Sequence, residues 1–103
     1  RGQIKGGLVE GPLAMDNAID ENAARTKGIV SEVAGRANVL IMPDLDAANM
    51  FFKQMTYVAY AEGAGLVLGS KVPVILNSRS DSEMSRLASC AVVSLQYANR
   101  KNK

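Results

Sequence analysis

Short apolar runs alternate with helical patterns along this chain of 103 residues, and that alternation constrains the fold more than any other feature. The run NVLIMP, residues 38–43, is stopped by proline and is typical of a buried strand. GLVLGS and VPVILNS, interrupted at Gly69 and Pro73, predict two further strands or one broken strand. The loosely alternating residues 4–9 indicate another strand near the start.

Three segments between or after these runs carry helical signals. A short helix is predicted over residues 20–27, with Asp20 as its N-cap and Gly28 just after its end. A longer helix, capped by one of its two early aspartates, is predicted over residues 44–63; its apolar residues occupy nearly every face, so we expect it to be largely buried. An amphipathic helix follows Asp81, with apolar positions at Met84, Leu87, Ala88, Ala91, Val92 and Leu95.

Strands that alternate with helices predict an α/β protein, in which helices cover both faces of a mostly parallel sheet. A chain of 103 residues suits one modest domain of this kind. Ligands of open α/β sheets bind beyond the carboxyl ends of the strands. That rule points to three loops, at residues 10–17, 43–46 and 77–82.

The composition excludes several classes of chemistry. One cysteine, Cys90, and no histidine exclude an internal disulfide, a cysteine–histidine zinc site and a histidine-based nucleophile triad. General acid–base chemistry would fall to carboxylates, lysine or tyrosine. Cys90 lies in an apolar helical pattern, so we expect a buried, inert thiol rather than a reactive one.

Charge and hydropathy bound the partners and the location. The net charge of +2 is too small to predict nucleic-acid binding, and the basic tail NRKNK is expected to be a solvated end. We find no bilayer-spanning stretch and no secretory signal, so we expect a cytoplasmic protein without a membrane partner. The chain begins at Arg1 without methionine, which indicates a processed end, an end outside this chain or a fragment of something longer.

The polar stretch LNSRSDSE, residues 76–83, precedes the last predicted helix. Ser80 and Glu83 match a capping box, and Asp81 would suit the first helical turn. This structural interpretation leaves Arg79 unexplained, because a cation ahead of a helix N-terminus opposes the helix dipole unless an anion lies between them. Exposed amides, hydroxyls and a guanidinium would bind phosphate or carboxylate. The residues alone favour neither interpretation of Arg79, as part of an anion site or as a solvated side chain, over the other.

Asn49, Lys53 and Tyr57 follow one another at intervals of four, so they stack along one face of the predicted buried helix. A polar stripe on an apolar helix costs free energy unless it meets partners or a cleft. The alternative is that this stripe is the solvent-facing side of the helix, with the ammonium group reaching water. The residues alone slightly favour that alternative.

Two glycine-containing segments carry weaker signals. In EGPLAMDNA, Gly11 and Pro12 predict a turn, and the acceptors that follow fit an Asx-type turn with a helix start. Gly63 and Gly65 match neither the dinucleotide fingerprint nor the lysine-bearing phosphate loop. We interpret them as turn glycines.

Three motifs, EGPLAMDNA, PDLDAANMFFK and VPVILNSRSDS, together resemble the phosphate acetyl/butyryltransferase family, in particular its butyryl branch. The resemblance runs from about Ile4 to Leu95 and matches only the C-terminal portion of such an enzyme. It implies a fold similar to that of isocitrate and isopropylmalate dehydrogenases, with two α/β domains and a cleft between them. Residues 1–72 would belong to the second domain, and residues 73–103 would return toward the first, unless all 103 residues form one unit.

The resemblance also implies an activity. The family moves a short acyl group between coenzyme A and inorganic phosphate, by direct attack and without a covalent acyl-enzyme. Its members need no metal or redox cofactor and are usually dimers or larger. The expected reaction is therefore acyl-CoA plus phosphate giving acyl phosphate plus CoA. This chain alone is expected to be inactive, because half of the cleft would be missing.

Matched motif by motif, Ser78 and Arg79 correspond to the family's active-site serine–arginine pair. The arginine would hold phosphate or the charge that develops on the carbonyl oxygen, and the serine would bond the thioester or the leaving thiolate. Lys53 corresponds to a pocket lysine and Asn49 to the asparagine one turn before it. With Gly11 and Pro12, they complete the expected substrate-binding set.

The general base is the least defined role. In the acetyl branch an acidic residue further along the last helix is taken as the base, and here Ser85 occupies the matching position. Asp81 is the nearest substitute, with Glu83 second. Other departures from the family pattern, at Glu10, Ala48, Phe52 and Asn77, bear on acyl specificity and turnover.

Two other functions remain as alternatives. A self-associating α/β module could bind anions or coenzyme A without turnover, and the departures at Glu10, Ala48 and Ser85 motivate it. A decarboxylating dehydrogenase of similar fold ranks last, because we find neither its cluster of metal-binding aspartates nor a nicotinamide site in the sequence.

Overall fold

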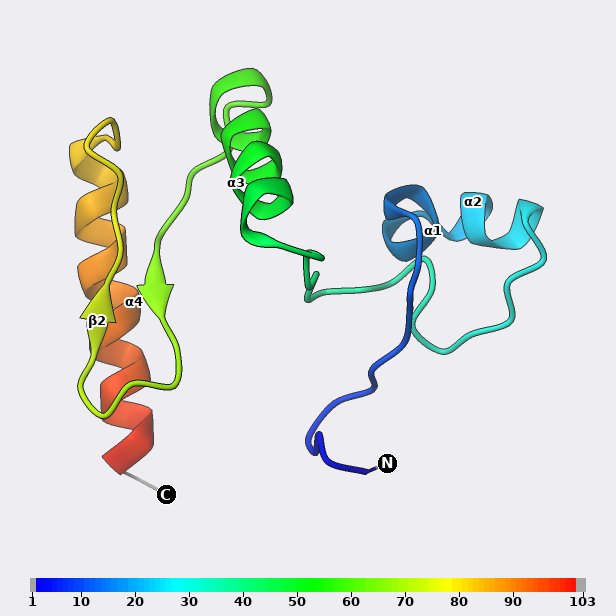
Figure 1. Cartoon of the computed structure of the whole chain (residues 1–103), viewed down its shortest axis with the longest axis horizontal. Helices are drawn as coiled ribbons and strands as arrows, with labels where there is room; N and C mark the ends of the chain where they lie inside the picture. Colours follow the sequence, from blue (N-terminus) through cyan, green and yellow to red (C-terminus); the bar gives the residue numbers. More distant parts are fainter. Residues whose placement is uncertain (1, 102–103) are drawn as a thin grey trace. The chain divides into compact units, whose positions relative to one another are not determined.

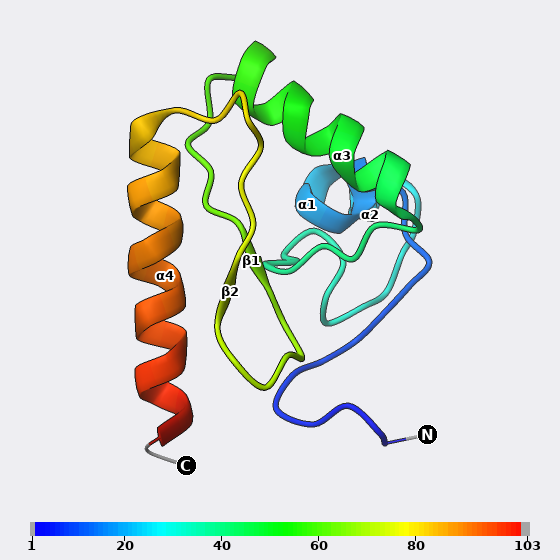
Figure 2. The ribbon, with the colours of Figure 1, turned by 60° about the vertical axis from the view of Figure 1, so that its left-hand side comes forward.

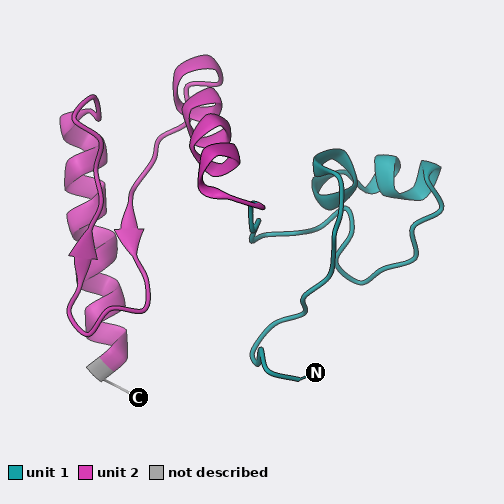
Figure 3. Cartoon of the chain, in the orientation of Figure 1, with its two compact units in different colours: residues 1–42 teal, residues 43–103 magenta. Residues whose placement is uncertain are grey.

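Two separate groups of elements make up the computed structural model, which describes residues 2–101. Unit 1 ends at Met42 and unit 2 begins at Pro43 (Figure 3). Unit 1 contains two short helices, and unit 2 contains helices and a pair of strands (Figure 1). The elements are α1 (Met15–Ile19), α2 (Glu21–Thr26), α3 (Leu45–Lys53), the π-helix η1 (Gln54–Val58), β1 (Leu66–Val67), β2 (Val74–Ile75) and α4 (Glu83–Lys101).

Unit 1 is organised around the start of α2. Asp20 accepts a hydrogen bond from the backbone N–H of Ala23 at 2.7 Å, which confirms it as the N-cap. Gly28 follows the helix at a φ of 67°, the left-handed conformation that glycine adopts most readily. The small core of this unit is made of short side chains at Asn17, Ala18, Ala24 and Ala34.

Unit 2 is built on a two-stranded antiparallel sheet, with Leu66 opposite Ile75 and Val67 opposite Val74. Helix α4 lies alongside both strands in both views (Figures 1 and 2). The α/β character is confirmed, and both strands fall in the predicted runs. The predicted parallel orientation is wrong for this pair. Only residues 68–73 join the strands, whereas a parallel pair needs a crossover of a dozen or more residues.

Two of the predicted strands do not form within residues 2–101. Residues 4–9 and 38–43 contain no strand, and their apolar side chains are largely exposed, as at Val9 (70%) and Ile41 (88%). A strand needs a neighbouring backbone to satisfy its N–H and C=O groups. Within the described part of the chain neither segment pairs with a strand, so their hydrophobic patterns alone are not sufficient.

Helix α3 differs from its prediction in length and in burial. Asp44 caps it by accepting from the N–H of Ala47 at 2.7 Å, and the helix passes directly into η1 after Lys53. The chain leaves the helix at Tyr60, with a φ of 56°, rather than at Gly63. None of its side chains is buried, because no layer in the described part of the chain covers its outer faces.

Helix α4 begins two residues later than the capping-box prediction requires. The hydroxyl of Ser82 accepts from the N–H of Ser85 at 3.1 Å and donates to its hydroxyl at 3.2 Å, so Ser82 is the cap. Ser80 instead bonds the hydroxyl of Ser78, and Glu83 is the exposed first residue of the helix. The capping-box assignment was therefore wrong, because the polar turn that precedes the helix takes up Ser80.

The thiol of Cys90 is exposed, so the prediction of a buried thiol was wrong. The apolar pattern of α4 continues onto faces that no element of the described chain covers, as at Leu87 (66% exposed) and Leu95 (67%). Within the described residues, no helix combines the length and apolar character that a membrane span requires.

Replacing Ser82 by alanine should lower the free energy of unfolding by about 1 kcal/mol, because α4 loses its side-chain cap. Ser80 lies two residues earlier and outside the helix. Because this position is exposed, Ser80→Ala should lower the free energy of unfolding by only about a few tenths of a kcal/mol. Urea unfolding of the two purified variants, followed by circular dichroism, measures the difference. A larger loss of stability in Ser80→Ala than in Ser82→Ala would show that Ser80 is the cap after all, as the capping-box prediction had it.

Candidate active site

One pocket of unit 2 gathers most of the residues that the sequence singled out. It has a volume of about 440 Å³ and opens between the end of α3, the approach to β1 and the loop that follows β2. Its walls combine apolar and polar side chains. The lining residues are Asn49, Phe52, Lys53, Gly63, Ala64, Gly65, Leu66, Leu76, Asn77, Ser78 and Asp81.

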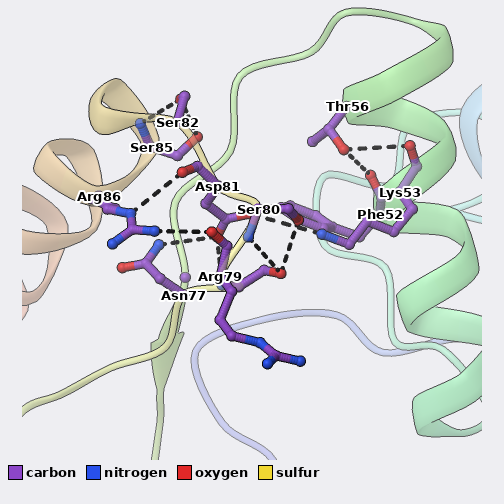
Figure 4. A network of polar contacts seen from close by, with 12 residues as sticks. Phe52, Lys53, Thr56, Asn77, Arg79, Ser80, Asp81, Ser82, Ser85 and Arg86 are labelled. Carbon is purple, nitrogen blue, oxygen red and sulfur yellow. Dashed lines mark hydrogen bonds and ion pairs between the residues drawn. The ribbon is translucent and has the colours of Figure 1, made fainter.

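Asp81 organises the polar side of this pocket (Figure 4). Its Oδ2 accepts from the backbone N–H of Ser78 at 2.8 Å and from Nδ2 of Asn77 at 3.2 Å. Its Oδ1 lies 3.8 Å from Nζ of Lys53. These contacts favour the charged carboxylate, so the pKa of Asp81 is lowered, first by the Ser78 bond and then by the Asn77 bond. The capping-box interpretation placed Asp81 in the first turn of α4. In the structure Asp81 instead precedes the helix.

Lys53 is held between a carboxylate and two aromatic rings. Its ammonium lies 5.6 Å from the ring centre of Phe52 and 5.6 Å from that of Tyr57, at cation–π distance. Asn49, one turn earlier, lines the pocket as well. Two members of the predicted polar stripe therefore face a pocket, while Tyr57 contributes its ring and remains 57% exposed.

Ser78 and Arg79 occupy different positions relative to the pocket. Ser78 lines it, and its hydroxyl lies 3.0 Å from that of Ser80. Arg79 is exposed and does not line the pocket. Its guanidinium has no hydrogen-bond or ion-pair partner among residues 2–101 and points away from the carboxylate of Asp81 (Figure 4). The structure thus leaves this cation unneutralised by the described residues.

Arg86 is a contributor that the sequence did not reveal. Its guanidinium donates to the backbone carbonyls of Asp81 at 3.3 Å and of Arg79 at 3.1 Å (Figure 4). The first turn of α4 thereby holds the loop that carries Ser78 and Asp81. The sequence signal that could have identified Arg86 is its position in the first turn of α4, directly after the polar loop.

The two glycines of the pocket are more than turn residues. A Cβ on Gly65 would lie 2.0 Å from the carbonyl oxygen of Leu76, across the antiparallel pair. A Cβ on Gly63 would lie 2.7 Å from the ring of Phe52. At Gly65 the obstacle is backbone, so that position needs glycine, whereas at Gly63 it is a ring that can move aside. A glycine at the edge of a strand pattern is the sequence signal for such an approach.

Polar residues close to Gly11 and Pro12, the predicted site residues of unit 1, have local partners. Gly11 and Pro12 precede α1, and Glu10 accepts a hydrogen bond from the hydroxyl of Ser31. Asp16 pairs with Lys27 at 2.7 Å, and this bond is the main cause of its lowered pKa. Asp16 also accepts from the N–H of Asn17 at 2.9 Å, one residue on rather than the two residues of an Asx-type turn, while the predicted helix start is present as α1.

The acid side of the pH profile offers a test of the Asp81 contacts. A carboxylate whose folded-state pKa lies below its usual value of 3.8 stabilises the fold above that value and loses the effect as the pH falls through the folded-state pKa. The free energies of unfolding of the wild type and of Asp81→Asn should therefore differ at neutral pH and converge as the pH falls below about 4 and through the lowered folded-state pKa of Asp81. Chemical denaturation at stepped pH measures both. If the difference between the two free energies of unfolding stays constant down to the lowest pH, the assigned contacts of Asp81 are wrong.

Comparison with known proteins bears directly on this pocket. A family profile described as Phosphate acetyl/butaryl transferase matches residues 1–94, which include every residue of the pocket. The chain belongs to this family. The family predicted from the three motifs is thereby confirmed.

Individual relatives of the phosphate acetyl/butyryltransferase family agree. A phosphate acetyltransferase of Rhizobium meliloti is 59% identical over 98% of this chain and 32% of its own length. One of Thermotoga maritima is 52% identical over 89% of this chain and 31% of its own length. A phosphate butyryltransferase of Clostridium beijerinckii is 46% identical over 98% of this chain and 33% of its own length. The chain spans about a third of the length of these curated relatives.

Proposed function

We propose that the protein which carries this chain transfers a short acyl group between coenzyme A and inorganic phosphate. The supporting observation is that Asn49, Lys53, Ser78 and Asp81 converge on one pocket in a member of this family. In the proposed reaction a phosphate oxygen attacks the thioester carbonyl, a C–O bond forms, the C–S bond breaks, and CoA leaves as the thiolate. No covalent acyl-enzyme intervenes.

The pocket, together with Arg79, which follows Ser78 but does not line the pocket, offers each reacting group a partner of suitable chemistry. The apolar wall formed by Phe52, Leu66 and Leu76 suits a short acyl chain. The hydroxyl of Ser78 can donate to the thioester oxygen or to the leaving thiolate, and the guanidinium of Arg79 can hold phosphate. Positioning and charge stabilisation would supply most of the acceleration.

Asp81 has a different role in this proposal from that of a strong base. Its lowered pKa makes it a weak proton acceptor near neutral pH. Phosphate already carries unprotonated oxygens there, so its attack does not require a protein base. We assign to Asp81 the orientation of Lys53 and of the Ser78 backbone.

For the whole protein we propose the two-domain α/β architecture of the isocitrate and isopropylmalate dehydrogenases, with residues 1–72 in the second domain and residues 73–103 returning toward the first. Gly11 and Pro12 would then join the substrate-binding set. We further propose self-association, a cytoplasmic location and activity without metal or redox cofactor. The family membership of the chain supports these proposals.

The test is phosphate-dependent release of free thiol from acetyl-CoA and from butyryl-CoA by the purified whole protein. We expect release only when phosphate is present, and the ratio of the two rates reports acyl preference. Release without phosphate would indicate a thioesterase instead. A protein that binds CoA without releasing thiol would support the non-catalytic module, and turnover by the isolated 103-residue chain would contradict our expectation that it is inactive.

A further inference from the structure

Ser89, in the second turn of α4, has no exposed surface and all of its hydrogen-bonding capacity in use. Its hydroxyl donates to the backbone carbonyl of Ser85 at 2.7 Å. It accepts from the backbone N–H of Gly65 at 3.0 Å and from Nδ2 of Asn77 at 3.0 Å. A hydroxyl has one hydrogen and two lone pairs, so these three bonds complete it.

The direction of these bonds determines how Asn77 is oriented. Because the hydrogen of Ser89 is committed to the Ser85 carbonyl, Ser89 can only accept from Asn77. The NH₂ group of the amide, and not its oxygen, must therefore face α4. The same NH₂ group donates to Oδ2 of Asp81 at 3.2 Å (Figure 4). A buried hydroxyl is thus linked through one amide to the carboxylate of the pocket.

We infer that Ser89 is a positioning residue, which sets the Asn77 amide and through it holds the Asp81 carboxylate at the pocket. It acts on other residues rather than on substrate, because it is fully buried and does not line the pocket. The other charged groups that act on Asp81 are Lys53, from α3, and Arg86, from α4. The kinetic consequence rests on the proposed function, whereas the positioning itself does not.

Ser94 shows what distinguishes Ser89 on the same helix. The hydroxyl of Ser94 makes the same kind of bond, to the carbonyl of Cys90 at 2.8 Å, but Ser94 is exposed. That bond to the preceding turn is common in helices and links nothing else. The two bonds that Ser89 accepts instead reach 24 and 12 residues along the chain. Ser94→Ala is therefore the matched control.

The experiment uses the whole protein and two readouts. The first is the titration of Asp81, followed by the carboxyl ¹³C shift of selectively labelled aspartate and assigned as the signal that Asp81→Asn lacks. Ser89→Ala should raise the pKa of Asp81, because the donor that favours its charged form is no longer held in place. The second is phosphate-dependent thiol release. Its kcat should fall about tenfold with little change in KM, and Ser94→Ala should alter neither readout.

A double-mutant cycle with Asn77→Ala tests the route. If Ser89 acts through Asn77, Ser89→Ala should add little to either readout once the amide is gone. Additive effects, or an unchanged Asp81 titration in Ser89→Ala, overturn the inference. If Ser89→Ala does not fold, Ser89→Cys can be used, because a thiol is a weaker hydrogen-bond acceptor of similar size to the hydroxyl. It should raise the pKa of Asp81 by less than Ser89→Ala would.

The two readouts separate the inference from the function it builds on. Absence of thiol release by the wild type would refute the proposed acyl transfer. The titration of Asp81 in the same samples would still decide whether Ser89 positions it.

Discussion

Replacing Arg79 by alanine should lower phosphate-dependent thiol release by about two to three orders of magnitude, the range typical of removing one group that stabilises developing charge. The guanidinium has no partner among the described residues, so its charge is available for an anion. It follows β2 and precedes the N-terminus of α4, whose free N–H groups also favour an anion. The loss should appear in kcat/KM for phosphate.

Two variants make this result specific. Arg79→Lys keeps the charge but not the planar fork, and should recover only part of the rate. Arg100→Ala removes the same charge at the far end of α4, where Arg100 donates to the carbonyl of Ser70 at 2.9 Å, and should leave the rate unchanged. A wild-type rate in Arg79→Ala would show that our assignment of the serine–arginine pair is wrong.

Replacing Gly65 by alanine should destabilise the fold by about 3 kcal/mol, the upper end of the usual overpacking range. The added Cβ would lie 2.0 Å from the carbonyl oxygen of Leu76, which is backbone and cannot rotate away. Relief of that clash must separate the strands, and would break the bond from the Leu76 N–H to the Gly65 carbonyl at 3.1 Å. It would also disturb the bond from Gly65 to Ser89.

Thermal and urea unfolding of the purified protein measure this loss, and two other glycines calibrate it. At Gly7 a Cβ would meet nothing within 4 Å, so Gly7→Ala should leave stability almost unchanged. At Gly63 the Cβ would meet the ring of Phe52, which can move, so Gly63→Ala should cost less than Gly65→Ala. Equal stability of Gly65→Ala and the wild type would mean that the strands do not pair as described.

Local signals predicted the elements that depend on neighbours in sequence. The caps at Asp20 and Asp44 involve residues within about one helical turn, and the structure confirms both. Helix α4 also forms where its pattern predicts it, but its predicted apolar face is largely exposed, as at Met84 (60%) and Leu95 (67%). The start of α4 was placed wrongly because the serines at alternate positions, Ser78, Ser80 and Ser82, could each act as its cap. The competition was settled by Ser80, which bonds Ser78 instead.

The candidate site was predictable to the extent that motif residues carried it. Asn49, Lys53, Ser78 and Asp81 were named from the family motifs and come together at one pocket. Arg86 and Ser89 were missed: Arg86 acts on backbone carbonyls of the loop before α4, which no side-chain pattern reveals, and Ser89 acts on groups that lie far from it in sequence. No spacing rule connects a serine of a helix with a glycine 24 residues earlier.

The sequence by itself determined the family, the α/β composition and most helix positions of this protein, because motifs, caps and periodicity are written in consecutive residues. Only the tertiary structure decided the antiparallel pairing of β1 and β2 and the exposed faces of α3 and α4. It alone also decided the bonds that link Ser89, Asn77 and Asp81. These features depend on which distant backbones and side chains meet, and that is set by packing in three dimensions.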